Sequence, residues 1–357
     1  MVAVKSVWQK GFLESGAPKE EHFEIKESEL SGVTADNQPE EDGAVIVEVR
    51  YMSCDPYMRG FLKSQGRPAE EGKKIVSAFV SGIILASRNE NWKVNDLFGG
   101  SLPLSTVQVV PAKAVAGLWN LSQYIGEESL SQGIGALGMP GSTAYGGFID
   151  VLEPKEGQTI FVSAASGAVG SIVGQIAKNV YKCTTVGSCG GQAKCEHIKS
   201  DFGYDHAIDY KSIDQSGADK GAAELKAKLK EAVPMGIDMY FENVGGIHFD
   251  AAMNSLRPKG RVAVCGGISG YNDKDGPRQE VDILSLIYTA QRIEGFVCTP
   301  WLTGQQGNFL GDMSQWIKEG KVKVEETTYN GVEQWATAFN SLFENTHRNK
   351  GKVVVKV

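Results

Sequence analysis

The pattern of apolar residues differs between the two ends of the chain and its middle. Up to about residue 129 the apolar positions form runs rich in β-branched residues, such as AVIVEVRYMS and KIVSAFVSGIILAS, which predict β-strands. The segment VTADNQPEEDG directly before the first of these runs is polar and rich in turn-forming residues, so we expect a surface loop there. Helical periodicity is rare in this region, which therefore predicts a β-rich domain.

Short apolar strands alternate with helical segments from about residue 130 onward. The predicted strands are TIFVSAA, CTTVGS, HAIDY, IDMYFENVGG, RVAVCGG and RIEGFVC. Helical spacing is clear in AVGSIVGQIAKNV and AAELKAKLKEAV, and the stretch from Lys194 to Phe202 also reads as a helix. This alternation predicts an α/β domain with a doubly wound parallel sheet of the Rossmann type.

The end of the chain returns to a mixed pattern. After Trp301 we expect a helix (MSQWIKEG), a strand (KVKVEETTY), a second helix (VEQWATAFNSLFEN) and a final strand (KVVVKV). A terminal strand this apolar is expected to pair with the first β-rich region. A length of 357 residues also suits two domains. We therefore predict one domain from residues 1–129 with 315–357, and a nucleotide-binding domain from residues 130–314.

Composition excludes several classes of partner. The chain has 36 basic and 43 acidic residues, a formal net charge of −7, and no long basic run, so we expect neither nucleic acid nor an anionic membrane surface as a partner. No stretch reaches the run of about 20 apolar residues that spans a membrane. The N-terminal residues contain no apolar segment of signal-peptide length, so we expect a cytoplasmic protein.

The six cysteines and five histidines lack the spacing of a metal site. There is no C-x-x-C, H-x-x-H or H-x-x-x-H pair. Cys195 and His197 are neighbours, but on a lysine-rich stretch without a second ligand pair. We predict no bound metal. Taken alone, Cys265 and Cys298 lie in apolar runs and read as small buried hydrophobic residues.

The clearest local motif is a strand, a small-residue turn and a helix in TIFVSAASGAVGSIVGQIAK. Residues 165–170 read Ala-Ser-Gly-Ala-Val-Gly, a dinucleotide-binding fingerprint with alanine in the first glycine position. Gly167 lets the backbone approach a pyrophosphate, and Gly170 allows close packing of the helix on the strand. The N–H groups at the start of the helix face the phosphates.

Charge distinguishes NADP from NAD in this motif. An NAD site usually places an acidic residue at the end of the second strand, about 20 residues on, where it binds the ribose 2′-hydroxyl. Here that strand ends in Val186-Gly187-Ser188-Cys189-Gly190-Gly191, and the next charged residue is Lys194. A solvated lysine on a helix explains Lys194 equally well by itself, but the missing acid favours a 2′-phosphate and hence NADP.

Six ordered motifs make the chain similar to a known family. They are DPYMRG, LGMPGSTAYGGF, AASGAVGSIVGQIAK, FENVGG, CGGISGYN and NKGKVVVKV, and together they extend over nearly the whole chain. The sequence resembles the zinc-independent medium-chain reductases that include prostaglandin reductases (leukotriene B4 12-hydroxydehydrogenases), alkenal double-bond reductases and curcumin reductases. The resemblance implies a GroES-like catalytic domain around a Rossmann domain, NADPH as hydride donor, and a homodimer.

The resemblance also implies roles for individual residues. Lys194 and Tyr210 would hold the 2′-phosphate, which agrees with the charge argument, and Met139 and Thr143 would lie close to the nicotinamide. The other cofactor-binding positions implied are Gly167, Ala168, Val169, Gly170, Asn243, Cys265, Gly266, Gly267, Ile268, Ser269, Phe296, Val297, Cys298 and Asn349.

Two tyrosines are the candidate catalytic residues. Hydride transfer to the β-carbon of an enone leaves negative charge on the carbonyl oxygen, which a hydroxyl donor can stabilise. Tyr271 matches the tyrosine that the family assigns to this role, and Tyr57 matches one that lines the substrate pocket. Read without the family, each is one of 11 tyrosines and is explained as a packed aromatic residue with a satisfied hydroxyl.

The sequence departs from the family pattern after Tyr271. A proline-rich loop is common there, but this chain has Asn-Asp-Lys-Asp-Gly-Pro-Arg at residues 272–278, so the substrate's length and polarity stay open. Cys54 occupies roughly the place of a zinc ligand in related alcohol dehydrogenases, but the G-H-E partner motif is absent. We interpret Cys54 as structural or incidental.

The motifs favour reduction of the carbon–carbon double bond of α,β-unsaturated aldehydes or ketones, a small-molecule reaction. One alternative is an NADPH quinone oxidoreductase of the ζ-crystallin group, which typically lacks DPYMRG, GMPG and GISGYN together. A second alternative is a non-catalytic NADPH-binding protein, against which intact Tyr271, Lys194 and Gly167 argue. Oxidation of a hydroxyl group on a lipid mediator stays open as a second activity.

Overall fold

The computed structural model describes residues 2–214, 216–344 and 348–357. Within these residues the chain forms two compact units. Of the described residues, the first unit draws on 2–139, 326–344 and 352–357, and the second on 140–214, 216–325 and 348–351. The chain changes unit at 139/140 and 325/326, where the sequence placed boundaries at 129/130 and 314/315. Residues 348–351 belong to the second unit, and the chain then re-enters the first unit with its last strand.

The first unit is built on two antiparallel-rich sheets. The larger has the strand order β15-β16-β3-β5-β6-β8, with β7 also paired to β3, and the smaller has the order β2-β1-β4. The strands are β1 (Ala3–Lys10), β2 (Phe23–Glu29), β3 (Val45–Ser53), β4 (Lys73–Ile75), β5 (Ser77–Ser87), β6 (Leu97–Pro103), β7 (Val107–Val110), β8 (Leu118–Asn120), β15 (Glu326–Asn330) and β16 (Lys352–Lys356).

The terminal strand pairs with the first β-rich region, as the sequence predicted. Residues Val354 to Lys356 of β16 lie antiparallel to Ser53 to Tyr51 of β3, and β15 lies parallel to β16 on its other side. Behind this sheet α10 (Trp335–Asn340) buries Trp335 and Phe339, whose rings stack at 5.1 Å. The apolar face of α10 thus closes the core of the first unit.

The second unit contains a six-stranded parallel sheet with the order β11-β10-β9-β12-β13-β14. Numbered along the sheet's own strands this order is 3-2-1-4-5-6, the doubly wound Rossmann arrangement that the sequence predicted. The strands are β9 (Thr159–Val162), β10 (Thr184–Cys189), β11 (His206–Asp209), β12 (Ile237–Glu242), β13 (Leu256–Val264) and β14 (Arg292–Gly295). The order reverses between β9 and β12, where ligands of such sheets bind.

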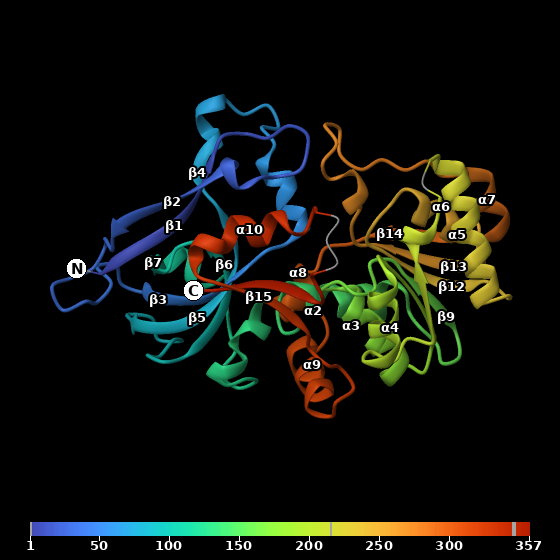
Figure 1. The fold of residues 1–357 in the computed structure, drawn as a ribbon. Coiled ribbons are helices and arrows are strands. Elements are labelled where there is room, and N and C mark those ends of the chain that lie inside the picture. Colours follow the sequence, from blue (N-terminus) through green and yellow to red (C-terminus); the bar gives the residue numbers. More distant parts are fainter. Residues whose placement is uncertain (1, 215, 345–347) are drawn as a thin grey trace. The chain divides into compact units, whose positions relative to one another are not determined.

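Helices cover both faces of this sheet. Figure 1 places α3 (Gly170–Gln175) and α4 (Gln192–Ser200) on one face, and α5 (Ala218–Ala232), α6 (Ile247–Met253) and α7 (Ile283–Thr289) on the other. The amphipathic helix predicted from AAELKAKLKEAV is α5, which turns Leu225 and Leu229 into the core. The remaining helices are α1 (Ala112–Val115), α2 (Met139–Gly146), α8 (Thr299–Leu302) and α9 (Phe309–Lys318).

The sequence patterns missed α6 and α7, which are short and lie between predicted strands. No helix in the described part of the chain is both long and apolar enough to cross a membrane.

A buried ion pair connects the last strand of the first unit to the DPYMRG segment. The Lys352 ammonium lies 3.0 Å from a carboxylate oxygen of Asp55, and both side chains are 4% exposed. Lys352 also donates to the carbonyl oxygens of Cys54 at 2.6 Å and Val353 at 3.0 Å, while Ser53 donates its hydroxyl to Asp55. Each buried charge is therefore compensated by a partner and by hydrogen bonds, the condition under which burying charge is tolerated.

Replacing Lys352 by methionine is expected to lower the free energy of unfolding of the first unit by about 3–5 kcal/mol, because it leaves the Asp55 carboxylate buried without its cation. The measurement is the urea midpoint, followed by tryptophan fluorescence. Lys356→Met on the exposed end of the same strand is the matched control, and it should shift the midpoint little. Equal shifts for the two variants would contradict a structural role for the ion pair.

Candidate functional site

Most of the predicted cofactor residues lie at one edge of the parallel sheet. All pairings within this sheet are parallel, so the carboxyl ends of its strands share one edge. Gly167, Ala168, Val169 and Gly170 follow β9, Lys194 follows β10, Tyr210 follows β11, Asn243 follows β12, the run Cys265, Gly266, Gly267, Ile268 and Ser269 follows β13, and Phe296, Val297 and Cys298 follow β14.

The turn after β9 is tight enough to require glycine. Ala164 adopts a left-handed conformation with φ of 50°, and its carbonyl accepts the N–H of Gly167 at 2.9 Å. A Cβ on Gly170 would lie 2.5 Å from the same carbonyl oxygen. A Cβ on Gly174 would lie 2.0 Å from the ring of Tyr204, whose hydroxyl donates to the Gly170 carbonyl at 2.7 Å. These contacts bring the start of α3 close to the strand end, as a pyrophosphate site requires.

Two further segments join this turn. The side chain of Asn243 donates to the carbonyl of Ser163 at 2.7 Å, and its backbone N–H donates to the Ser163 hydroxyl at 2.9 Å. The N–H of Gly351, two residues after Asn349, donates to the carbonyl of Ser166 at 2.9 Å. The structure thus brings Asn243 and the Asn349 segment to the point where the strand order reverses.

Lysines gather at the carboxyl end of β10. Burial, and after it the positive charges of Lys211 and Lys350, lower the pKa of the Lys194 ammonium. In the described part of the chain the Lys194 side chain forms no ion pair and no hydrogen bond with the protein. An anion bound here would relieve the repulsion among these cations.

The backbone at Gly190 lies in close contact with Lys211 and Tyr210. A Cβ on Gly190 would lie 2.9 Å from the Lys211 Cε and 3.0 Å from the Tyr210 hydroxyl. One carboxylate oxygen of Asp209, Oδ1, accepts the N–H groups of Gly191 at 2.8 Å and Lys211 at 2.9 Å and is therefore bound by the backbone. The residues present therefore fit a 2′-phosphate better than a ribose hydroxyl that needs a carboxylate.

The buried imidazole of His248 packs against the ring of Tyr210. The rings of Tyr210 and His248 meet edge to face at 5.2 Å, and the Nε2 of His248 lies 2.8 Å from the Ser188 hydroxyl. Burial lowers the pKa of His248 to about 4, so the imidazole is neutral near pH 7.

Tyr271 lies half-buried beside the turn after β13. Its hydroxyl accepts the N–H of Gly267 at 3.3 Å, which leaves the hydroxyl hydrogen available to another acceptor. Burial raises the pKa of Tyr271, so the hydroxyl stays protonated near neutral pH and can act as a donor. The segment that carries it is attached to β12, because Ile268 donates to the Asn243 carbonyl at 3.1 Å and Ser269 to that of Val244 at 3.0 Å.

Helix α2 carries the two residues expected near the nicotinamide, Met139 and Thr143, one turn apart. Thr143 is buried. Just after this helix, a Cβ on Gly147 would lie 2.3 Å from the ring of Phe296, so the segment after β14 packs against the end of α2. Of that segment Phe296 and Cys298 are half-buried, whereas Val297 is exposed.

Tyr57 lines a cavity within the first unit. The cavity has a volume of about 430 Å³, and its lining includes Phe61, whose ring meets Tyr57 edge to face at 5.5 Å, and the buried Trp335. Arg59 of the same motif donates to the carbonyls of Gly16 at 3.0 Å and Leu13 at 2.8 Å. The charged residues of DPYMRG are thus bound by the surrounding fold, while Tyr57 lines the cavity.

The described residues include no group of three or more histidine, cysteine, aspartate or glutamate side chains that could hold a metal ion. The thiol of Cys54 lies 4.0 Å from the Trp335 carbonyl, and burial raises its pKa well above the usual range. Cys54 is therefore suited to packing and not to ligating a cation.

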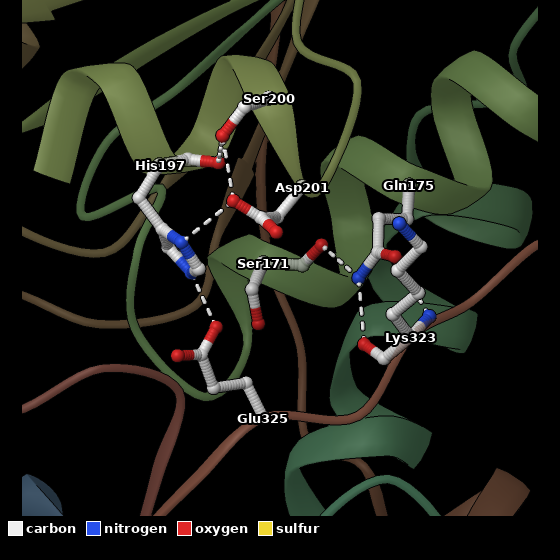
Figure 2. Close-up of polar contacts among 7 residues, drawn as sticks. All are labelled: Ser171, Gln175, His197, Ser200, Asp201, Lys323 and Glu325. Atoms are coloured by element: carbon white, nitrogen blue, oxygen red, sulfur yellow. Dashed lines mark hydrogen bonds and ion pairs between the residues drawn. The ribbon is translucent and has the colours of Figure 1, made fainter.

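The helices that frame the site are attached to the segment before β15 (Figure 2). His197 of α4 contacts Glu325 through Nε2, and its Nδ1 lies 3.0 Å from the Asp201 carboxylate. Gln175 of α3 donates to the Lys323 carbonyl at 3.0 Å and accepts the Lys323 N–H at 2.7 Å. These bonds fix the ends of α3 and α4 that lie away from their first turns.

Sequence reasoning missed Lys211, Lys350 and His248 as neighbours of the predicted site. Lys211 directly follows Tyr210 after β11, a signal that was available once Tyr210 had been assigned. Lys350 and His248 approach Lys194 and Tyr210 from distant parts of the chain, so no local pattern indicated them.

Two family models and several known proteins match this chain. The model of the zinc-binding dehydrogenase family matches residues 168–316, and the N-terminal domain of oxidoreductase matches residues 11–118. Prostaglandin reductase 1 of Sus scrofa is 34% identical over all of both chains. The NADP(+)-dependent 2-alkenal reductase of Nicotiana tabacum is 37% identical over 100% of this chain and 98% of that protein.

Solved structures agree in fold. CurA from Vibrio vulnificus in complex with NADPH is 30% identical, covers 99% of both chains, and superimposes with a TM-score of 0.80. A quinone oxidoreductase of Pseudomonas syringae has a TM-score of 0.73 at 20% identity over 99% of this chain and 100% of that one, a likeness of fold alone. The chain therefore belongs to the NADP-dependent prostaglandin reductase, alkenal reductase and curcumin reductase family of the medium-chain dehydrogenase/reductase superfamily.

Proposed function

We propose that this protein uses NADPH to reduce the carbon–carbon double bond of α,β-unsaturated aldehydes and ketones. The observation that carries the proposal is the Tyr271 hydroxyl, which is kept protonated and accepts a backbone N–H, so its own hydrogen is available for a carbonyl oxygen. The relationship to an NADP(+)-dependent 2-alkenal reductase supports the same reaction class.

NADPH is the proposed cofactor because Lys194, Lys211 and Lys350 lie near the end of β10, and the Asp209 carboxylate there accepts two backbone N–H groups. Lys194 would pair with the 2′-phosphate, and Tyr210 would pack beside it. Residues 167–170 would receive the pyrophosphate at the start of α3. Asn243, Asn349 and the segments 265–269 and 296–298 would line the rest of the cofactor.

The proposed reaction adds a hydride to the β-carbon of the substrate. NADPH supplies the hydride when it is bound. The electron pair of the double bond then moves to the carbonyl oxygen, and Tyr271 donates a hydrogen bond to that developing enolate. A proton from solvent water then adds to the α-carbon and completes the saturated product. Tyr57 is proposed to line the substrate pocket, because it faces the cavity of the first unit.

The alternatives make different predictions about turnover. An NADPH quinone oxidoreductase shares the Rossmann arrangement, but nothing in its chemistry calls for a hydroxyl donor beside an enone carbonyl. A non-catalytic NADPH-binding protein would bind the cofactor and consume none of it with any of these substrates.

Removing the Lys194 charge is expected to weaken NADPH binding by roughly 10- to 100-fold, because one hydrogen bond between charged groups is worth about 1.5–3 kcal/mol. Cofactor fluorescence titration of Lys194→Ala measures this loss, and NADH affinity should change little. Lys199→Ala, an exposed lysine on the same helix, is the matched control. An equal loss for NADH and NADPH would remove Lys194 from the phosphate site.

The reaction is tested by following NADPH consumption with an enone panel, the corresponding saturated carbonyls and a quinone. Enones alone should be turned over, with a saturated carbonyl as product. Tyr271→Phe should lower kcat by roughly 100-fold, the usual effect of losing one donor to a developing oxyanion, with unchanged NADPH affinity. Tyr124→Phe, at a half-buried position in the first unit outside the proposed site, is the control. Turnover confined to the quinone, or full activity of Tyr271→Phe, would refute the proposed reaction.

We also propose a homodimer. Helix α7 buries none of its residues and exposes Ile283, Leu284, Ile287 and Tyr288 by 61–84%, and β14, which follows it, is an edge strand of the sheet. An apolar helix face beside an unpaired strand edge suits a second copy of the same surface.

Ile287→Lys is expected to convert the protein to a monomer, because a charge is desolvated at the centre of the apolar face. Light scattering after gel filtration reports the mass. Val94→Lys, at a 55% exposed position in the first unit, should leave the dimer intact. A wild-type protein that is monomeric at every concentration would end the dimer proposal.

A further inference from the structure

Two buried cysteines lie side by side at the base of the lysine cluster. Cys189 is the last residue of β10 and Cys195 lies in the first half of α4, and their sulfur atoms are 3.4 Å apart. The two residues are 1% and 4% exposed. By contrast, the buried thiol of Cys183 lies 3.6 Å from the Lys155 carbonyl. A disulfide bond has a length of about 2.05 Å, so the two sulfur atoms need to approach by little more than 1 Å.

The two thiols are not equivalent. The hydrogen bond from the Cys189 thiol lowers the pKa of Cys195, and the same contact raises the pKa of Cys189. Cys195 is thus the thiol that ionises first, and thiolates are the nucleophiles in sulfur chemistry.

We propose that Cys189 and Cys195 are a redox-active pair that a hydroperoxide oxidises to a disulfide, and that this disulfide weakens NADPH binding. In the first step the Cys195 sulfur attacks a peroxide oxygen; an S–O bond forms, the O–O bond breaks, and an alcohol or water leaves. In the second step the Cys189 sulfur attacks the Cys195 sulfur; the S–S bond forms, the S–O bond breaks, and water leaves. The two thiols lose two electrons and two protons, and the hydroperoxide is reduced.

The position of the pair determines which part of the fold moves. Cys189 is paired in the sheet with Asp209 of β11, and the far end of α4 is held by His197 through Glu325 and Asp201 (Figure 2). The approach of the sulfur atoms therefore displaces the first turn of α4. That turn carries Lys194 and follows Gly191, whose N–H is bound to Asp209.

Oxidation and cofactor binding consequently oppose each other. This step rests on the proposed function, because it takes Lys194 as the partner of the 2′-phosphate. A cofactor that holds Lys194 keeps the first turn of α4 in place and slows disulfide formation, while the disulfide weakens the cofactor by the same coupling free energy. Because both sulfur atoms are buried, only small oxidants can reach them. A cofactor bound over the first turn of α4 would limit this access further and so slow the oxidation.

The experiment treats the full-length protein with hydrogen peroxide, alkylates the remaining thiols and maps the peptides by mass spectrometry. Trypsin cleaves after Lys182, Lys194 and Lys199, so the proposed bond joins peptide 183–194 to peptide 195–199 and makes the pair lighter by two hydrogens. Cys183 lies in the first peptide, so the variant Cys183→Ser must retain this cross-link. Cys195→Ser and Cys189→Ala must both lose the cross-link. Two variants are used so that the test does not depend on one variant that fails to fold.

The second measurement is NADPH affinity by fluorescence titration before and after oxidation. We expect oxidised protein to bind NADPH about tenfold more weakly, equivalent to about 1.4 kcal/mol, with recovery in dithiothreitol and no effect of peroxide on Cys195→Ser. Saturating NADPH should slow the cross-link severalfold.

Absence of the cross-link would overturn the redox pair, and a cross-link without a change in affinity would overturn its coupling to the cofactor. Reduced protein that binds no NADPH would instead refute the proposed cofactor, an outcome that the cross-link assay separates from the other two.

Discussion

The close approach of α3 to the end of β9 is the contact on which the candidate site depends. A side chain on Gly170 would collide with the Ala164 carbonyl at 2.5 Å, so only glycine allows the helix to begin where it does. Gly174 and Tyr204 continue this contact one turn later, and the Tyr204 hydroxyl closes it with a hydrogen bond to Gly170. The result is a helix start that presents unsatisfied N–H groups at the edge where five other strands also end.

The charged side chains at the end of β10 favour an anionic ligand at this edge of the sheet. The Asp209 carboxylate beside the end of β10 accepts two backbone N–H groups, while the positive charges of Lys211 and Lys350 act on Lys194. Their repulsion costs folding energy in the absence of an anion and is relieved by one. The first turn of α4 carries both Lys194 and its direct neighbour Cys195, so a change at one residue affects the other.

A buried ion pair stabilises the first unit. Asp55 and Lys352 are nearly 300 residues apart and neutralise each other inside it, which attaches the final strand to the segment that carries Tyr57. Because Arg59 is also bound by backbone carbonyls, the charged residues of DPYMRG are structural and Tyr57 is the member of the motif that faces a cavity. A motif that identifies a family thus combines fold-stabilising residues with one candidate for substrate contact.

The sequence by itself determined that the chain has a β-rich part and an alternating α/β part. It also determined the order of strands and helices in the Rossmann unit and the pairing of the last strand with the N-terminal β-rich region. These features follow from local periodicity and from the steric demands of single residues such as Gly170. The tertiary structure alone decided which side chains meet: the three lysines, the Cys189–Cys195 pair, His248 beneath Tyr210, and the ion pair of Asp55 with Lys352. Such contacts depend on strand order and on the rotation of each helix about its axis, which short-range patterns do not encode. Helices α6 and α7 were missed because they are too short for a clear period, and α7 gains no burial within its own unit that would mark one face as apolar.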